Sequence, residues 1–221
     1  MELLIHRLLE KDEAEKLEAE LTKNNGSWED GKKSAGSYAA KVKNNLQLDQ
    51  ESTKSRYLSE EIINHIENEP LIKSFALPRK MHGLRFSKTI AGQGYGNHVD
   101  NTYMSSGRSD LSFTLFLSNP KSYKGGELCI HSLQGSQQIK LDAGEIVIYP
   151  STSLHSVEKV TSGTRLVCVG WIQSYISSDE ERNLLFGLEA GAKGLLAKYG
   201  QSDELNLIFQ TYNNLLRRLG D

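Results

Sequence analysis

The chain has 221 residues, of which 38% are hydrophobic and 24% are charged, and its formal net charge is −2. This length and composition predict a folded protein with a substantial core, built as one large domain or as one domain with an extension. The near-neutral charge gives no general electrostatic case for binding nucleic acid or an anionic membrane.

The apolar runs and the cysteines limit the cellular compartments in which the protein is expected. The longest apolar run, Leu166 to Ile172, is too short to span a bilayer, and the N-terminal apolar run is too short for a signal peptide. The two cysteines, Cys129 and Cys168, lack CxxC spacing, which disfavours a structural zinc site. We expect a cytoplasmic protein with no membrane or nucleic-acid partner.

The first eighty residues carry helical and loop patterns. Residues 10–24 predict an amphipathic helix, because three apolar residues recur at helical spacing: Ala14, Leu17 and Leu21. Residues 25–56 are polar and contain glycines, so they indicate loops with at most one short strand. Ser59 has the character of an N-cap for a second helix that ends before Pro70. We expect residues 1–80 to form a helical and loop region that packs on the core.

Seven short segments follow that are rich in β-branched and aromatic residues and are separated by turn residues. They are 82–90, 111–118, 126–131, 136–141, 145–150, 153–160 and 164–174. Helical patterns lie outside this block rather than between its strands, which disfavours a parallel α/β sheet. The chain is therefore predicted to be mainly β with flanking helices, around a double-stranded β-helix (jelly-roll) core over 81–175.

The tail, 176–221, returns to helical patterns and predicts a C-terminal helical extension. Ser178 and Glu181 form a capping-box signature, and Gly200 and Gly220 stand where C-terminal caps belong. The apolar stripe of the last helix would suit either packing on its own domain or a homodimer interface.

His98 and Asp100 stand two residues apart in the stretch GQGYGNHVDN. In an extended segment both side chains leave one face, as two ligands of one metal ion require. A polar turn is the alternative, since Asn97 and Asn101 are typical turn residues. His155 lies in a predicted strand and is either a third ligand or a hydrogen-bonded core histidine.

Arg165 follows a predicted hairpin turn at 161–163, which would place it on the strand paired with that of His155. In such a hairpin the two residues would be about 13–17 Å apart by strand rise, a distance that an arginine and a dicarboxylic acid could cover together. Arg165 shares a strand face with Val167, Val169 and Trp171, where an unpaired guanidinium would be costly without an anionic ligand. The alternative is an exposed arginine at a strand end.

This set of residues resembles the iron(II)- and 2-oxoglutarate-dependent dioxygenases, which carry HxD, a histidine about fifty residues later and an arginine ten residues after it. The segments GYGNHVDN, LSNP, GGEL, DAGE and YPSTSLHSV are more closely similar to the PKHD-type (prolyl/lysyl hydroxylase-like) branch. The resemblance implies a hydroxylase that releases succinate and carbon dioxide. Its substrate is unidentified and would be a prolyl or lysyl side chain of a peptide, or a small molecule.

The resemblance also implies the cofactors and their residues. Iron(II) would be bound by His98, Asp100 and His155, which leave three coordination positions open, as in the facial triad of non-haem iron oxygenases. The far carboxylate of 2-oxoglutarate would be bound by Arg165. Molecular oxygen is the second cosubstrate, and the resemblance admits L-ascorbate as a further cofactor.

The resemblance also implies further residues around the cosubstrate. Two other classes of protein are compatible with the same His–Asp–His triad. The resemblance places Tyr95 and Leu128 beside 2-oxoglutarate, and Phe116 where the family often has a tyrosine, so that hydroxyl is absent here. A non-catalytic jelly-roll sensor of iron or 2-oxoglutarate would keep the triad without turnover. A zinc hydrolase would keep it as well, but would have no evident use for Arg165.

Overall fold

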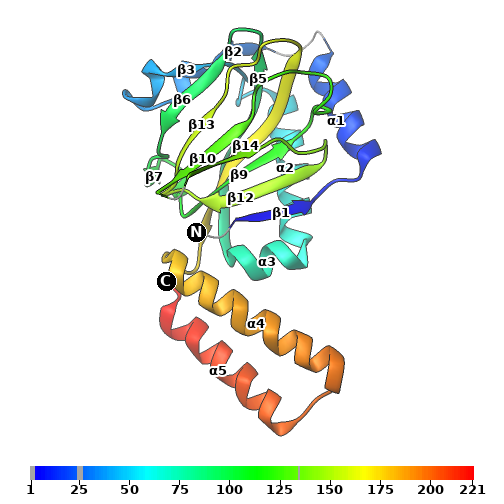
Figure 1. Ribbon diagram of the computed structural model, residues 1–221, viewed down its shortest axis with the longest axis vertical. Coiled ribbons are helices and arrows are strands. Elements are labelled where there is room, and N and C mark those ends of the chain that lie inside the picture. Colours follow the sequence, from blue (N-terminus) through cyan, green and yellow to red (C-terminus); the bar gives the residue numbers. More distant parts are fainter. Residues whose placement is uncertain (1–2, 24–26, 134) are drawn as a thin grey trace.

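A computed structural model describes residues 3–23, 27–133 and 135–221 of the protein. Two antiparallel β-sheets face each other at its centre, and a pair of long helices projects from one end of them (Figure 1). This architecture confirms the predicted mainly β fold with a jelly-roll core and flanking helices.

The larger sheet has seven strands in the order β1-β12-β9-β14-β5-β4-β2. Their bounds are β1 Leu4–Arg7, β12 Glu145–Pro150, β9 Leu111–Phe116, β14 Thr164–Ser174, β5 Pro78–Ile90, β4 Leu46–Leu48 and β2 Trp28–Asp30. Three of these strands, β1, β2 and β4, come from the first eighty residues. The region predicted as loops over 25–56 therefore contributes strands to the main sheet, together with the short 3-10 helices η1 (Gly31–Ser34) and η2 (Ala39–Lys41).

The smaller sheet has five strands in the order β11-β10-β13-β6-β3. Their bounds are β11 Gly135–Ile139, β10 Leu128–Ser132, β13 Leu154–Val157, β6 Gly94–His98 and β3 Lys43–Asn44; a separate hairpin joins β7 (Tyr103–Met104) to β8 (Gly107–Arg108). From β9 to β14 each connection crosses from one sheet to the other, except the hairpin of β10 and β11, which stays within the smaller sheet. Side chains from both sheets therefore meet in the space between them.

The hairpin predicted between the strands of His155 and Arg165 is wrong. β13 pairs with β10 and β6 in the smaller sheet, whereas β14 pairs with β5 and β9 in the larger one. The segment that connects β13 to β14 is hydrogen-bonded to two other loops. The amide of Val160 donates to the carbonyl of Gln93, and the amide of Thr161 donates to that of Lys124. These contacts carry the chain across to the other sheet instead of back along β13.

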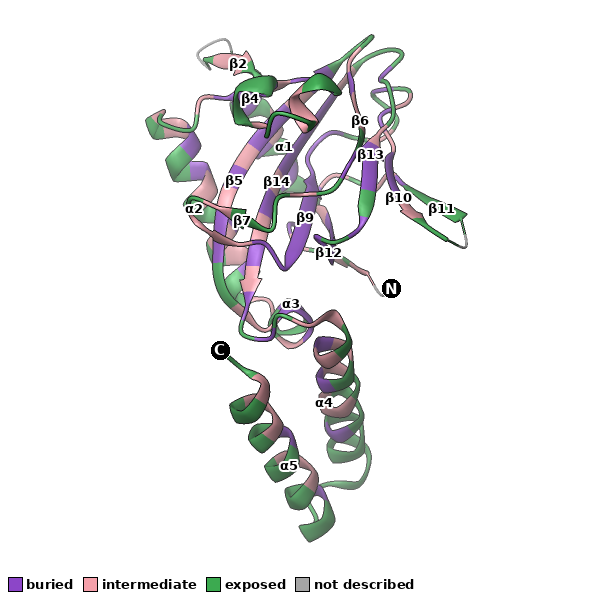
Figure 2. Cartoon of the chain, turned by 90° about the vertical axis from the view of Figure 1, so that its left-hand side faces the viewer, coloured by how far each residue is buried: buried purple, intermediate pink, exposed green. Residues whose placement is uncertain are grey.

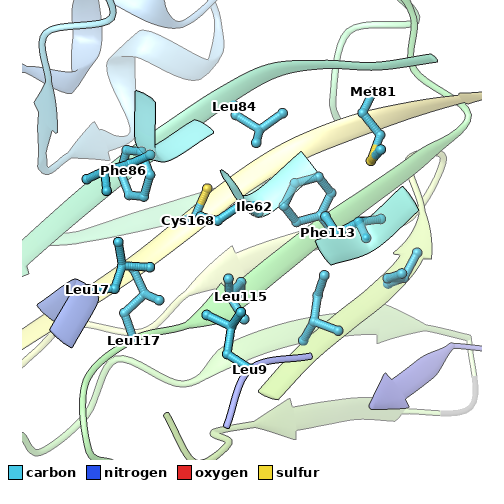
Figure 3. Close-up of a cluster of buried hydrophobic side chains, with 14 of the residues drawn as sticks. Leu9, Leu17, Ile62, Met81, Leu84, Phe86, Phe113, Leu115, Leu117 and Cys168 are labelled. Carbon is cyan, nitrogen blue, oxygen red and sulfur yellow. The ribbon is translucent and has the colours of Figure 1, made fainter. Parts of the chain in front are cut away.

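Three helices cover the outer face of the larger sheet: α1 (Lys11–Thr22), α2 (Thr53–Asn68) and α3 (Pro70–Ala76). Leu17 of α1 and Ile62 of α2 pack against Phe86, Leu115 and other buried residues of the sheet (Figure 3). Among the strands of this sheet, β9 and β14 are mostly buried (Figure 2), and β12 is buried over all but its first residue. This core fixes the sheet whose inner face forms one wall of the site described below.

The predicted start of the second helix is also wrong. Ser52, not Ser59, is the N-cap of α2, and its hydroxyl accepts a hydrogen bond from the amide of Ser55 at 3.2 Å. The helix extends towards its N-terminus because Ser55 and Leu58 are buried against the core. The helix α2 ends before Pro70, as predicted. Pro70 is also the first residue of α3, directly after the N-cap Glu69.

The C-terminal extension consists of α4 (Asp179–Tyr199) and α5 (Asp203–Leu219), which pack against each other and project away from the sheets (Figure 1). The predicted cap at Ser178 is present, since its hydroxyl accepts a hydrogen bond from the amide of Glu181 at 3.3 Å. Of the helices in the described ranges, none is long and apolar enough to cross a membrane.

Candidate active site

A cluster of three metal-binding side chains lies between the sheets. His98 ends β6, Asp100 follows it, and His155 lies directly opposite His98 on the neighbouring strand β13. One ligand atom from each residue lies within 4.8 Å of those of the other two. Within the part of the chain that the structure describes, this is the one group of three or more His, Cys, Asp or Glu residues that could hold a metal ion.

Both imidazoles are oriented by the backbone of their own strands. Nδ1 of His98 lies 2.9 Å from the carbonyl oxygen of Gly96, and Nδ1 of His155 lies 2.9 Å from that of Ser153. A carbonyl oxygen only accepts hydrogen bonds, so each Nδ1 carries a proton, and Nε2 is the nitrogen of each ring that is left for a metal ion. Burial, and then the nearby His155, lower the pKa of His98 to about 4, which keeps that imidazole in the neutral form that binds metals.

The carboxylate of Asp100 is oriented by the opposite sheet. Its Oδ2 accepts hydrogen bonds from the hydroxyl of Ser112 at 2.6 Å and from the indole nitrogen of Trp171 at 2.9 Å. Ser112 also shares a hydrogen bond of 2.7 Å with the hydroxyl of Ser151. Nε2 of His98 and Nε2 of His155 each lie 3.9 Å from an oxygen of the carboxylate. A donor set of two imidazoles and one oriented carboxylate fits a divalent iron ion.

Arg165 is a buried cation without an anionic partner. Its side chain is only 3% exposed, its Nε has no hydrogen-bond partner, and none of the described carboxylates lies within 4 Å of the guanidinium. Burial lowers its pKa, an effect partly offset by Tyr123 and Tyr149. The guanidinium lies 5.4 Å from the centroid of the Phe116 ring. A buried guanidinium with an unused donor fits the carboxylate of an acid such as 2-oxoglutarate.

One cavity of about 380 Å³ joins these groups. The residues that line it include the triad, Arg165, Tyr95 and Leu128, together with Tyr149, Val167, Val169 and Trp171. The four β14 residues predicted to share a face, Arg165, Val167, Val169 and Trp171, therefore all face this cavity. Its volume is in the range of pockets that hold small ligands.

Tyr95 and Leu128 lie at different places in the cavity. The ring of Tyr95 stacks on the imidazole of His98, with centroids 3.6 Å apart and an interplanar angle of 17°. Leu128 belongs to a buried cluster with Phe116, Tyr149 and Val167 between the sheets, which is the cluster around Arg165. Leu128 therefore lies in the part of the cavity near Arg165, whereas Tyr95 covers one face of the His98 imidazole.

Several contacting residues were not identified from the sequence. Ser112 and Trp171 orient Asp100, and Tyr149 packs edge-on against His155 with ring centroids 5.2 Å apart. A buried tryptophan needs a hydrogen-bond partner for its indole N–H. Because Trp171 shares a strand face with Arg165, the sequence could have predicted that its indole N–H binds a polar group of the site. The serine and the tyrosine carried none, because only the packing of the two sheets brings them to the triad.

Two facing antiparallel sheets with a His–Asp–His cluster between them define the jelly-roll oxygenase class, and comparisons with known proteins agree. The model of the 2OG-Fe(II) oxygenase superfamily matches residues 82–173. Two PKHD-type hydroxylases of Prochlorococcus marinus, from strains MIT 9211 and MIT 9313, are 65% and 63% identical over 221 and 220 residues, and the matches cover all of each chain.

Solved structures share the fold at low sequence identity. A prolyl-4-hydroxylase of Pseudomonas putida superposes with a TM-score of 0.55 at 18% identity, over 78% of this chain and 92% of that one. A prolyl hydroxylase of Trichoplax adhaerens, in complex with a hypoxia inducible factor peptide, superposes with a TM-score of 0.54 at 14% identity, over 83% and 86% of the two chains.

The chain belongs to the PKHD-type hydroxylases of the 2-oxoglutarate- and iron(II)-dependent oxygenase superfamily. It is an oxidoreductase whose cofactor is iron(II) and whose cosubstrates are 2-oxoglutarate and molecular oxygen. The predicted family and enzyme class are confirmed.

Proposed function

We propose that His98, Asp100 and His155 hold the iron(II) of this hydroxylase and that Arg165 binds the far carboxylate of 2-oxoglutarate. One observation carries the proposal: a cluster of two histidines and one carboxylate shares a cavity with a buried guanidinium that has no carboxylate partner in the described chain. The triad leaves three coordination positions for the cosubstrate and oxygen. Zinc hydrolysis would leave Arg165 without a role.

The bound iron and 2-oxoglutarate supply the oxidising chemistry, in which one atom of O₂ enters a substrate C–H bond and the other enters succinate as carbon dioxide is lost. The protein holds and orients these groups. Backbone carbonyls fix the two imidazoles, and Ser112 and Trp171 fix the carboxylate of Asp100. Arg165 anchors the acid against the apolar wall that includes Leu128, and this wall keeps water from the reacting groups.

The substrate is proposed to be a molecule with an aliphatic C–H bond presented at the triad. The prolyl or lysyl side chain indicated by the family name stays a candidate, as does a small molecule. Residues of η1, β3 and the β7–β8 hairpin line another part of the cavity, and they include Ser34, Lys43 and Tyr103. We assign this polar part to the substrate, because the apolar end around Arg165 and Leu128 is taken by 2-oxoglutarate.

Oxygen-dependent turnover tests the proposal. The protein is mixed anaerobically with iron(II) and 2-oxoglutarate, the visible metal-to-ligand charge-transfer band is recorded, and succinate is measured after oxygen is admitted, with and without L-ascorbate. We expect the band and succinate with the natural chain and neither with His98→Ala. A band that survives in His98→Ala would contradict the metal assignment, and a band without any succinate would favour a sensor.

A further inference from the structure

A second buried cation lines the same cavity. Lys43, on β3, is 7% exposed, and its Nζ donates a hydrogen bond to the hydroxyl of Ser34 at 3.0 Å. None of the carboxylates in the described ranges lies within ion-pair distance of this ammonium. Lysine is almost never buried without a charged partner, so this position calls for an explanation.

The ammonium lies close to the proposed metal centre. Lys43 is paired with Tyr95 across β3 and β6, and its Nζ lies 5.2 Å from the centroid of the Tyr95 ring. That ring is in turn 3.6 Å from the centroid of His98, so Nζ lies no more than about 9 Å from the imidazole. A small ligand bound at Lys43 can therefore present a carbon to the metal.

A second positive charge, that of Arg85, lies near Lys43 and repels it. Arg85, on β5, lies over Trp171 at 5.6 Å from the ring and donates one hydrogen bond to Gln50. Its Nε is buried without a partner, and it forms no ion pair with the described carboxylates. Burial, and then repulsion by Arg85, lower the pKa of Lys43 to about 8. The two cations destabilise each other unless an anion lies near them.

The remaining charges of the site do not supply that anion. With iron(II) and doubly negative 2-oxoglutarate bound, their formal charges and those of Asp100 and Arg165 cancel. Asp100, and after it Asp30, attract Lys43 in the protein without metal. The charge of Asp100 is neutralised once it coordinates the ion, and Asp30 does not come within ion-pair distance of the ammonium. Lys43, which lines the part of the cavity left for the substrate, then lacks an ion-pair partner, and Arg85 is close enough to repel it.

We propose that Lys43, supported by Arg85, binds a carboxylate of the substrate, so that the enzyme hydroxylates a carboxylic acid at a carbon several bonds from its acid group. The inference rests on the assignment of the metal and cosubstrate sites given above. Ser34, Asn45 and Gln47 line the same part of the cavity and offer polar groups for the rest of the molecule. The ammonium of an unmodified lysyl substrate would be repelled by Lys43. Of the two side chains in the family name, prolyl and lysyl, the lysyl side chain is therefore disfavoured as the substrate.

Three probes with one carbon skeleton separate charge from shape: cyclopentanecarboxylate, cyclopentanecarboxamide and cyclopentylmethylammonium. Each is titrated calorimetrically into anaerobic protein loaded with iron(II) and 2-oxoglutarate, with the charge-transfer band as a check on loading. We expect the carboxylate to bind at least about ten-fold more tightly than the carboxamide and the ammonium not to bind. Equal affinity for acid and amide, or no binding of the acid, would overturn the inference.

Variants assign the effect to Lys43. Lys43→Met should lower the affinity for the carboxylate about ten-fold and leave that for the carboxamide unchanged, whereas Lys43→Arg should retain most of the preference. Lys41→Met removes an exposed lysine two residues away and should change neither. Wild-type affinity for the acid in Lys43→Met would contradict the role of this residue.

The same titrations distinguish the two levels of the proposal. If the charge-transfer band does not form in the natural chain, the metal and cosubstrate assignment fails; if it forms and the acid does not bind, only the inference on the substrate fails. N-acetyl-L-proline and a tetrapeptide that ends in a free proline carboxylate then show whether the acid is a small molecule or a peptide terminus.

Discussion

Replacing Arg165 by methionine should change stability and cosubstrate affinity in opposite directions. The guanidinium is 3% exposed and its Nε has no partner, a situation that costs about 1–3 kcal/mol for a buried polar group. The thermal midpoint of the ligand-free variant should therefore rise by about 2–12 °C for a chain of this size. Affinity for 2-oxoglutarate should fall about 30–1,000-fold, because a buried charge-assisted pair worth about 2–4 kcal/mol is lost.

Arg182 provides a matched control, since it is also buried but fully partnered. It is 2% exposed, and its guanidinium donates to the carbonyls of Ile176 and Ser177 and to the carboxylate of Asp179. Arg182→Met leaves these acceptors without a donor, so it should destabilise the protein by about 1–3 kcal/mol. Its affinity for 2-oxoglutarate should stay unchanged, because Arg182 lies at the start of α4 outside the cavity.

Differential scanning calorimetry of the metal-free proteins and anaerobic titration of the charge-transfer band measure the two effects. If Arg165→Met were destabilised like Arg182→Met and bound 2-oxoglutarate as the natural chain does, Arg165 would be a structural residue. The assignment of the cosubstrate carboxylate would then be wrong.

Three further predictions concern the metal, the pH dependence and the backbone. Trp171→Phe removes the indole donor to Asp100 and should weaken iron(II) binding about 10–100-fold in an anaerobic competition titration; unchanged affinity would exclude an orienting role. The pKa of Lys43 is lowered from 10.5 to about 8, so between these pH values the unfolded chain binds more protons than the folded one. Over this pH range the free energy of unfolding of the metal-free protein, measured by urea titration, should rise by about 3 kcal/mol. If a Lys43→Met variant showed the same rise, the lowered pKa of Lys43 would not be its cause. Gly163→Ala should cost more than about 1 kcal/mol, because φ is +78° and a Cβ would lie 2.2 Å from a carbonyl oxygen. Gly191→Ala in α4, with nothing within 4 Å, should gain up to about 1 kcal/mol; equal thermal midpoints would contradict both expectations.

The strands of the core could be predicted from the sequence because their signal is local. Alternation along 164–174 places Arg165 and Trp171 on one face and Cys168 on the other, and β14 has the predicted bounds. The partner of a strand is not a local property. The false hairpin after His155 arose because the contacts that redirect the chain, such as the amide of Thr161 with the carbonyl of Lys124, join residues far apart in sequence.

The same distinction applies to helix starts and to the site. Ser52 and Ser59 have similar capping chemistry, and only the burial of Leu58 decides between them. The triad was predictable because its spacing is a motif, and the structure brings its three members together. The buried Lys43 was not, since a lysine in a polar loop segment has no sequence signal for burial, and its position depends on the pairing of β3 with β6.

An anaerobic crystal structure with iron(II) and 2-oxoglutarate tests the site assignment most directly. We predict an ion about 2 Å from Nε2 of His98, from Nε2 of His155 and from a carboxylate oxygen of Asp100, with the far carboxylate of 2-oxoglutarate in a bidentate contact with Arg165. Iron bound by other residues, or 2-oxoglutarate whose far carboxylate lies away from Arg165, would contradict it.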